Sequence, residues 1–427
     1  MTSRNSSGHP AHLLNGHTAV LRTLDPDQPA LHDLEPLRAI VEDSRVVSIG
    51  EGAHFVHEFT LARARLLRYL VERCGFTVLA CELGAGEAAA VNPWLAGAGD
   101  DADLPQVTGA LSAGLFGELL RWLRRYNRSR SQPLQILGID LPNTLTLRPD
   151  LDPVADYLRL VDADAADLLA TVLPTADQIT GGSAAVSAPR WASLGTARQH
   201  ALTACLAKLS LRARALEPIY VSRSDRRRYD TVRRHLDAAC HTDYMLQAMN
   251  DLFSGGGLSG DTSIRDYYMA TTVQWHLDHT GPDTRVVVIA HNNHIQKTPV
   301  TFDGHLTALP MGHYLARSLG RQYRAVALTH TADGVPEMAF PAEASPVGFA
   351  VEQVRLGTPP PGSVEKALAE AGLDTAITLT DLRSPEPAVA SLAGIRSQSA
   401  AMETNLQQAF DAVLCSPTAT RDTTVNF

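Results

Sequence analysis

Short apolar runs rich in β-branched residues alternate with segments of helical periodicity along most of the chain. Such runs are typical of buried strands, and the segments between them are typical of helices packed on a sheet. The predicted strands are VVSI (46–49), FTVLACE (76–82), LQILGIDL (134–141), VVVI (286–289), YRAVALTHT (323–331), DTAITLTDL (374–382) and AFDAVLCS (409–416). The predicted helices are 58–74, 115–127, 264–280 and the segment that Ser363 caps. This alternation predicts an α/β fold with a mostly parallel central sheet flanked by helices.

Residues 151–262 have a different pattern, with long stretches of helical periodicity and no convincing strand. We predict that they form an inserted all-helical region, which caps the active-site cleft as a lid or binds substrate. The α/β catalytic core then consists of residues 31–150 and 263–427. Residues 1–30 are polar without a clear period, which predicts a loose N-terminal arm.

Two stretches of the chain echo each other, because VVSIGEGAH (46–54) and VVVIAHNNH (286–294) align without gaps. Each is a β-branched strand followed by a small residue and a polar loop that ends in histidine. Two parallel strands would bring both loops to the same carboxyl edge of a sheet, where α/β proteins build their sites. We therefore expect one pocket to receive the side chains of both loops.

Glu51, His54, His57 and Glu58 directly follow the first predicted strand. The glycines around Glu51 and His54 indicate a sharp turn that brings the chain close to another group. Histidine is also the side chain that most readily exchanges a proton near neutral pH. His57 and Glu58 are as well explained as ordinary polar residues at a helix start, where an acid favours the helix dipole.

Five further polar residues occupy similar positions. Arg63 lies on the helix after His54, at a spacing compatible with the same pocket or with an exposed helix face. Glu82 and Asp140 end predicted core strands, where a carboxylate is rare unless it is paired or functional. His291 and His294 lie in the loop after the strand VVVI. Histidines and carboxylates from several strand ends are therefore predicted to meet.

Two chemistries fit this set of residues. In metal-free hydrolysis, a histidine oriented by a carboxylate takes a proton from water, and cationic or imidazole groups stabilise the oxyanion. In a metal site, two or three histidines and one glutamate would be the ligands of zinc or manganese. The residues alone leave both chemistries open.

Composition and missing motifs exclude several other classes of protein. The chain has 427 residues, is 44% hydrophobic and 19% charged, and carries a net charge of −9, which argues against a nucleic-acid binder. Its apolar runs are too short to cross a bilayer, it begins without an apolar signal region, and its five cysteines include no CxxC pair. We expect a cytoplasmic protein that acts on a small molecule, without nucleic acid or membrane as partner. No GxSxG elbow or GxxxxGK[ST] loop occurs.

The chain resembles the erythromycin esterase family in several motifs. They are GEGAHFVHEFTLAR (50–63), CELGAGEAAAVNPWL (81–95), RDYYMATTV (265–273), VVVIAHNNH (286–294), MGHYLARSL (311–319) and AFDAVLCS (409–416). The resemblance extends over roughly residues 37 to 420, and the GExxH…EF and HNxH elements are fairly specific when they occur in this order. It implies an esterase that hydrolyses a macrolide lactone without a metal or other cofactor.

The resemblance also implies roles for individual residues. His54, the histidine of GExxH, would be the general base, oriented by Glu51 or Glu82. Arg63, His291 and His294 would bind the carbonyl and the developing oxyanion. Asp140, together with Arg265 and Met269 of the motif RDYYMATTV, is expected to bind substrate. Alternatives are a tailoring enzyme of natural-product biosynthesis that performs acyl transfer, lactonisation or elimination, a metal-dependent hydrolase, and a non-catalytic macrolide-binding protein.

Overall fold

An eight-stranded sheet lies at the centre of the computed structural model, which describes residues 14, 16–255, 262–302, 305–340 and 345–425. In spatial order its strands are β1 (Thr18–Leu21), β11 (Ile377–Asp381), β14 (Ala412–Ser416), β8 (Tyr323–His330), β2 (Val46–Ile49), β5 (Val286–Ile289), β3 (Val78–Gly84) and β4 (Ile136–Asp140). The six strands from β14 to β4 are parallel, and β1 and β11 are antiparallel to their neighbours. The predicted α/β fold with a mostly parallel sheet is confirmed.

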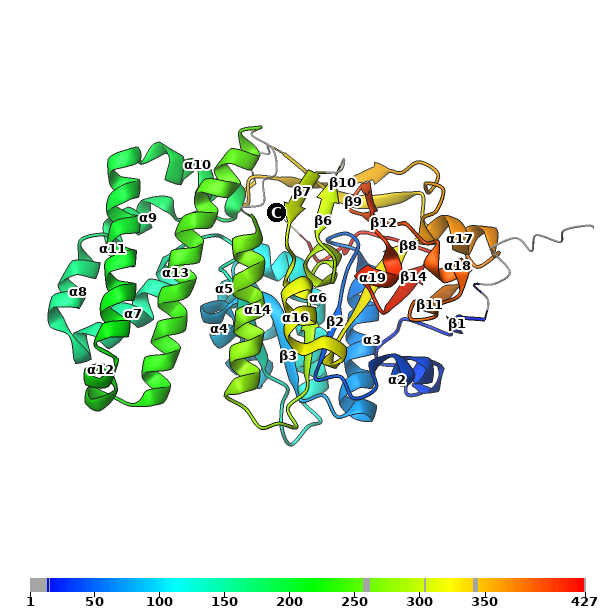
Figure 1. Cartoon of the computed structure of the whole chain (residues 1–427), viewed down its shortest axis with the longest axis horizontal. Helices are drawn as coiled ribbons and strands as arrows, with labels where there is room; N and C mark the ends of the chain where they lie inside the picture. The colour runs from blue at the N-terminus through cyan, green and yellow to red at the C-terminus, as the bar shows by residue number, and fades with distance from the viewer. Residues whose placement is uncertain (1–13, 15, 256–261, 303–304, 341–344, 426–427) are drawn as a thin grey trace, which may run out of the picture.

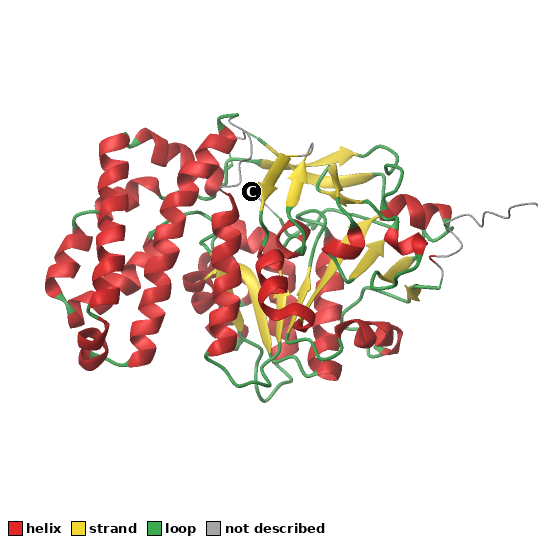
Figure 2. Ribbon diagram, viewed as in Figure 1, coloured by secondary structure: helices red, strands yellow, loops and turns green. Residues whose placement is uncertain are grey.

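Helices cover both faces of this sheet (Figures 1 and 2). On one face, α3 (His57–Cys74), α4 (Ala85–Leu95) and α6 (Ala110–Asn127) pack on one set of alternating strand residues. On the other face, α14 (Ser263–Asp278), α16 (Met311–Leu319) and α17 (Val364–Glu370) pack on the second set. Because both faces are buried, the central strands are continuous apolar runs, as parallel sheets require. Shorter helical elements connect these parts: η1 (His32–Leu34), α2 (Glu35–Val41), η2 (Asp101–Asp103), α5 (Leu104–Thr108), α15 (Asn292–Ile295), η4 (Gly320–Gln322), α18 (Pro387–Ala390) and α19 (Leu406–Ala409).

The N-terminal segment differs from our expectation of a loose arm. β1 pairs with β11 from Thr18↔Thr380 to Leu21↔Ile377, and Leu14 is buried in the core. Residues 1–13 and 15 lie outside the described residues. The strand was missed because its apolar residues are too few for a clear period, and its stability comes from pairing with a distant strand.

Three short hairpins above the sheet were not predicted either. They are β6 (Val300–Phe302) with β7 (His305–Ala308), β9 (Gly334–Ala339) with β10 (Ala350–Arg355), and β12 (Gly394–Ser397) with β13 (Ala400–Glu403). Each has short strands, and β9 contains Pro336, which weakens a strand signal. These hairpins lie near the carboxyl edge of the central sheet (Figure 2).

A lobe of helices stands beside the α/β part and leads from β4 to α14 (Figure 1). Its helices are α7 (Arg148–Val161), α8 (Ala163–Ala170), α9 (Leu173–Ile179), α10 (Ala184–Ser193), α11 (Thr196–Ala215), α12 (Glu217–Arg223) and α13 (Arg226–Phe253). They enclose an apolar core of their own, which includes Leu151, Leu206 and Leu246. That this lobe caps the active-site cleft as a lid or binds substrate stays a prediction. Within the described chain, no helix is long and apolar enough to cross a membrane.

Candidate active site

The loops after β2 and β5 leave the sheet side by side. The strands pair from Val46↔Val286 to Ile49↔Ile289, which is the same alignment as the echo in the sequence. Beyond the strands, the backbone N–H of Asn292 donates to the carbonyl of Glu51 at 2.9 Å. A Cβ at Gly50 would lie 1.9 Å from Oδ1 of Asn292, so this close approach requires glycine. The sequence therefore brings both polar loops to one edge.

His54 is held by a carboxylate that is itself held by an arginine. Its Nδ1 lies 2.7 Å from Oε1 of Glu51, and the other oxygen of Glu51 accepts from Nη1 of Arg63 at 2.7 Å. Burial raises the pKa of Glu51, but the charge of Arg63 and the hydrogen bond with His54 outweigh it and lower the pKa overall. The ionised Glu51 accepts a hydrogen bond from Nδ1–H of His54, which leaves Nε2 for a ligand.

Arg63 has a different role from the one predicted. Its side chain is only 3% exposed, and it donates to the carbonyls of Gly50 and Ala290 as well as to Glu51. All of its nitrogens are thereby directed at protein acceptors, and it does not line the cavity described below. Arg63 fixes Glu51 and the two loops, whereas a carbonyl ligand would need a guanidinium that faces the cavity.

Glu82 and Asp140 lie at the ends of β3 and β4 and hold Arg265 of α14 between them. Asp140 accepts from Nε of Arg265 with both oxygens, at 2.9 and 3.0 Å, and Glu82 accepts from Nη2 at 3.2 Å. The second oxygen of Glu82 accepts from the backbone N–H of His291 at 2.6 Å. Among the residues that the structure describes, Nη1 of Arg265 has no hydrogen-bond partner. This donor remains for a ligand.

His294 and His291 have opposite electrostatic environments, although both are buried. Burial lowers the pKa of His294, but the charges of Asp266 and Glu82 raise it to about 9, so this side chain is an imidazolium at neutral pH. Burial and the neighbouring charges of His54 and His294 lower the pKa of His291 well below its ordinary value. Its Nδ1 accepts from the backbone N–H of Asn293 at 3.2 Å, and its Nε2 has no partner in the described chain. The neutral His291 therefore offers an N–H at Nε2.

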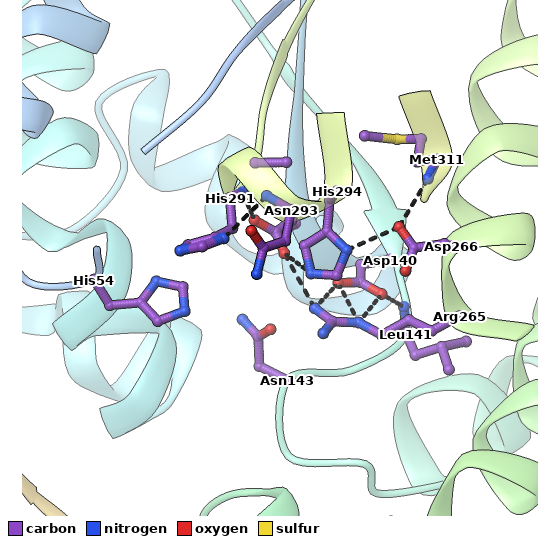
Figure 3. A network of polar contacts seen from close by, with 12 residues as sticks. His54, Asp140, Leu141, Asn143, Arg265, Asp266, His291, Asn293, His294 and Met311 are labelled. Carbon is purple, nitrogen blue, oxygen red and sulfur yellow. Dashed lines mark hydrogen bonds and ion pairs between the residues drawn. The ribbon is translucent and has the colours of Figure 1, made fainter. Parts of the chain in front are cut away.

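Five of the polar side chains described above line one cavity of 350 Å³: Glu51, His54, Glu82, Arg265 and His294. Figure 3 shows His54 on one side of the site, with Arg265, His291 and His294 grouped beyond it, and the His54 and His291 rings are 5.0 Å apart between centroids. Most of the remaining wall is apolar and includes side chains from α6, from α13 and from the segment between β9 and β10: Phe116, Met245, Met249, Phe253, Phe340 and Phe349. A second pocket of 260 Å³ shares His54, Arg265 and His294 with the first. The arrangement places a polar reaction centre against a large apolar surface.

The structure places the predicted residues in four groups. Five line the cavity: Glu51, His54, Glu82, Arg265 and His294. His291 lines the adjoining pocket, and Arg63 and Asp140 are buried behind the lining, where they hold Glu51 and Arg265. Met269 was predicted wrongly: it is fully buried in the core between α14 and the sheet and lines neither pocket. It follows Arg265 by four residues, but the apolar core under the helix takes its side chain.

His57 and Glu58 belong to the scaffold. His57 lies 2.7 Å from Glu118 of α6, and Glu58 accepts from the backbone N–H of Thr420 at 2.7 Å. Asp266 was not predicted as a site residue, although its Oδ1 lies 2.8 Å from Nδ1 of His294. Its position next to Arg265 in the motif RDYYM could have marked Asp266 as a site residue. That position was also explained without function, because an acid in the first turn of a helix is common and favours the helix dipole.

The alternative of a metal centre has no suitable group of ligands. Among the described residues, no three His, Cys, Asp or Glu side chains are arranged so that they could hold a metal ion. The nitrogen atoms and carboxylates of the site are instead paired with one another, as in Glu51 with His54 and Asp266 with His294.

Comparison with known proteins gives consistent matches over nearly the whole chain. The family model for erythromycin esterase matches residues 71–419. Erythromycin esterase type I of Escherichia coli is 38% identical over 405 residues, which are 94% of this chain and 97% of that protein. Erythromycin esterase type II of Escherichia coli is 35% identical over 390 residues, which are 89% and 91% of the two chains. The solved structure of a mutant of the erythromycin esterase EreC in its open conformation has a TM-score of 0.92 and 37% identity, and the match covers 96% of this chain and all of that one.

Proposed function

The chain belongs to the erythromycin esterase family and is a carboxylic ester hydrolase, and from this premise we propose that it opens a macrolide-like lactone, or a related ester, with water activated by His54. One observation carries the proposal: a histidine oriented by a carboxylate lines the same largely apolar cavity as two cationic groups, Arg265 and His294. Such a site supplies a base, an electrostatic partner for the oxyanion and a surface for a large apolar substrate.

His54 is the base in this proposal. Because Nδ1 donates to Glu51, Nε2 accepts a proton from water as the water oxygen attacks the ester carbonyl carbon. The ionised Glu51 stabilises the imidazolium that forms on His54, and Arg63 holds Glu51 in place. When the bond between the carbonyl carbon and the alcohol oxygen breaks, the imidazolium returns the proton to the leaving alkoxide. The products are a carboxylic acid and an alcohol, which are joined in one opened chain if the substrate is a lactone.

Arg265 and His294 stabilise the negative oxygen of the tetrahedral intermediate. Nη1 of Arg265 is the free donor of a guanidinium fixed by Asp140 and Glu82, and His294 carries a positive charge at neutral pH. The N–H of His291 at Nε2 adds a neutral donor next to His54. Fixed donors in a buried site stabilise an oxyanion without rearranging, which is why they accelerate acyl transfer.

The substrate class follows from the apolar wall and from the named relatives. Methionine and phenylalanine side chains from the helical lobe and from the β9–β10 hairpin line the cavity together with several leucines and alanines. Macrolides present large aliphatic faces around a single ester, and the relatives of this chain are erythromycin esterases by name. A flexible methionine surface adapts to irregular apolar shapes.

Incubation with erythromycin in heavy-oxygen water, followed by mass spectrometry, tests the proposal. We expect a product heavier by one water that carries one heavy oxygen in its new carboxyl group. His54→Asn should abolish turnover and keep the fold. His235→Asn is the matched control, because His235 also has Nδ1 bonded to a buried carboxylate, at 2.8 Å, but lies outside both pockets. We expect His235→Asn to retain turnover.

Two outcomes would count against the proposal. Full turnover in a folded His54→Asn variant would remove His54 as the base. A product without added water from a panel of macrolides and other esters would indicate acyl transfer or elimination in place of hydrolysis.

A further inference from the structure

Asp266 joins three helices behind the reaction centre. It lies in the first turn of α14, and its side chain is only 4% exposed. Its Oδ1 lies 2.8 Å from Nδ1 of His294 in α15 and also accepts from the backbone N–H of Met311, the first residue of α16, at 2.8 Å. Figure 3 shows Asp266 bridging His294 and Met311. One oxygen atom therefore fixes the position of His294 relative to two neighbouring helices.

His294 lies between two carboxylates. Asp266 contacts Nδ1, and on the other side Oε1 of Glu82 forms an ion pair with Nε2 at 3.3 Å. The charged and titratable groups around His294 are Asp266 and Arg265 from α14, Glu82 from β3, Asp140 from β4, Glu51 and His54 from the loop after β2, His291 from its own loop, and Tyr314 of α16 beside Asp266. Arg265 pairs with Asp140 and also contacts Glu82 at 3.2 Å, so Asp266 is the carboxylate that balances a charge on His294 without sharing it with an arginine.

We infer that Asp266 is a positioning residue, whose carboxylate keeps His294 as an imidazolium and orients its Nε2–H toward Glu82 and the cavity. His294 then acts as a fixed cation and never as the base. The side chain of Asp266 lies behind His294 and reaches the reaction only through it.

This inference deepens the proposed function and rests on it, because it explains how two neighbouring histidines take different roles. His54 has one carboxylate partner, Glu51, whose charge is shared with Arg63. His294 has two carboxylates within ion-pair distance. An opposite charge at such a distance raises the pKa of a histidine by about one to three units for each close partner. The different carboxylate neighbours of the two histidines thus make His54 a base and His294 a cation in one site.

Asp266→Asn is a sharp test, because it removes the charge and can retain both hydrogen bonds. His294 and Met311 bond the same oxygen of Asp266, and the amide oxygen of asparagine can accept from both. In a plot of kcat against pH, we expect the pH at which kcat falls on the alkaline side to be lower by about one to three units in this variant. At about pH 8.5, His294 with a pKa of about 9 is roughly three-quarters protonated, whereas a pKa of about 7 would leave roughly 3% protonated, so kcat falls about 25-fold. At about pH 6 both forms are protonated, and kcat should be nearly unchanged.

Asp150→Asn is the matched control. Asp150 lies 2.8 Å from Nδ1 of His235 and is as deeply buried as Asp266, but this pair belongs to the helical lobe and lines neither pocket. A general effect of removing a buried Asp–His ion pair would appear in both variants as lower stability. We expect only Asp266→Asn to move the pH profile. An alkaline limb that stays in place in a folded Asp266→Asn variant would overturn the inference.

A measurement without turnover separates this inference from the proposed function. NMR titration of the wild-type protein with labelled histidines, with the His294 signal assigned from a His294→Gln variant, should show His294 titrating near pH 9. A His294 signal that titrates below about pH 7 would refute the role of Asp266, whatever the activity. If His294 titrates as expected and no ester is hydrolysed, the proposed function fails and the electrostatic role of Asp266 remains.

Discussion

Replacing Glu51 by glutamine separates its effect on catalysis from its effect on stability. One oxygen of Glu51 bonds His54 and the other bonds Arg63, both at 2.7 Å. Glutamine keeps only one of these acceptors, so its NH₂ group must face one of the two donors. This differs from Asp266, where a single oxygen serves both neighbours. We therefore expect Glu51→Gln to impair both the reaction and the fold.

The size of the catalytic loss follows from the charge that forms on His54. When His54 takes a proton from water, an imidazolium forms next to the buried carboxylate of Glu51, whose side chain is 9% exposed. Two unit charges about 4 Å apart at an effective dielectric constant of about 20 attract by about 4 kcal/mol. Loss of this attraction in the transition state lowers kcat about 1,000-fold. The charge of Arg63, no longer neutralised, adds to the loss.

The stability effect has a separate origin, because Glu51→Gln leaves Arg63 buried without an anion. Breaking a buried ion pair in this way typically costs about 3–5 kcal/mol. In the double variant Glu51→Gln/Arg63→Gln no unpaired charge remains. We expect it to recover part of the free energy of unfolding but none of the lost kcat.

The two effects are measured independently in wild type, Glu51→Gln and the double variant. Mass spectrometry of lactone opening gives kcat, and urea unfolding gives the free energy of unfolding. A folded Glu51→Gln variant with kcat within about fivefold of wild type would refute the assignment of Glu51 as the partner of the base, because the expected loss is about 1,000-fold. Equal stability of the single and double variants would show that Arg63 does not depend on Glu51.

Three further predictions concern stability and substrate binding. The pKa of His294 is raised from an ordinary 6.5 to about 9, so the stability that its charge contributes is complete below about pH 6.5 and is lost as the pH rises through 9. In urea unfolding, the free energy of unfolding of wild type should exceed that of His294→Gln by an amount that shrinks by about 3 kcal/mol across this range. A difference that stays constant with pH would contradict the prediction. Met249 lines the cavity, so Met249→Ala should raise KM for a macrolide about tenfold in steady-state kinetics. Met269 is buried in the core, so Met269→Leu should leave KM unchanged. Equal effects of the two substitutions on KM would contradict the placement of these side chains. Gly50→Ala would place a Cβ 1.9 Å from Oδ1 of Asn292 and should lower the free energy of unfolding by about 1–3 kcal/mol in urea, and an unchanged midpoint would argue against the close approach of the two loops.

Local patterns predicted the central sheet and the loops that carry the site. The strand segments had apolar runs bounded by glycine or polar residues, and β2 and β5 pair in the register that their ungapped alignment suggested. That register alone brings Glu51 beside the loop of His291 and His294. The strand-end position likewise marked Glu82, which lines the cavity.

The direction of side chains on helices was harder to predict. Arg63 and Arg265 both lie on helices near the site, and spacing along the chain gave no reason to distinguish them. In the folded chain Arg63 is turned toward three buried acceptors, and Arg265 toward the cavity. Met269 shares a helix with Arg265 but faces the apolar core.

The sequence by itself determined which segments become strands, where each strand ends and which polar residues follow those ends, because these features depend on neighbours a few positions away. Only the tertiary structure decided the role of each polar group. Whether a histidine is a base or a cation depends on carboxylates brought to it from distant elements, as Asp266 is brought to His294 from 28 positions away along the chain. Electrostatic interactions depend on distance in space, and the fold sets that distance.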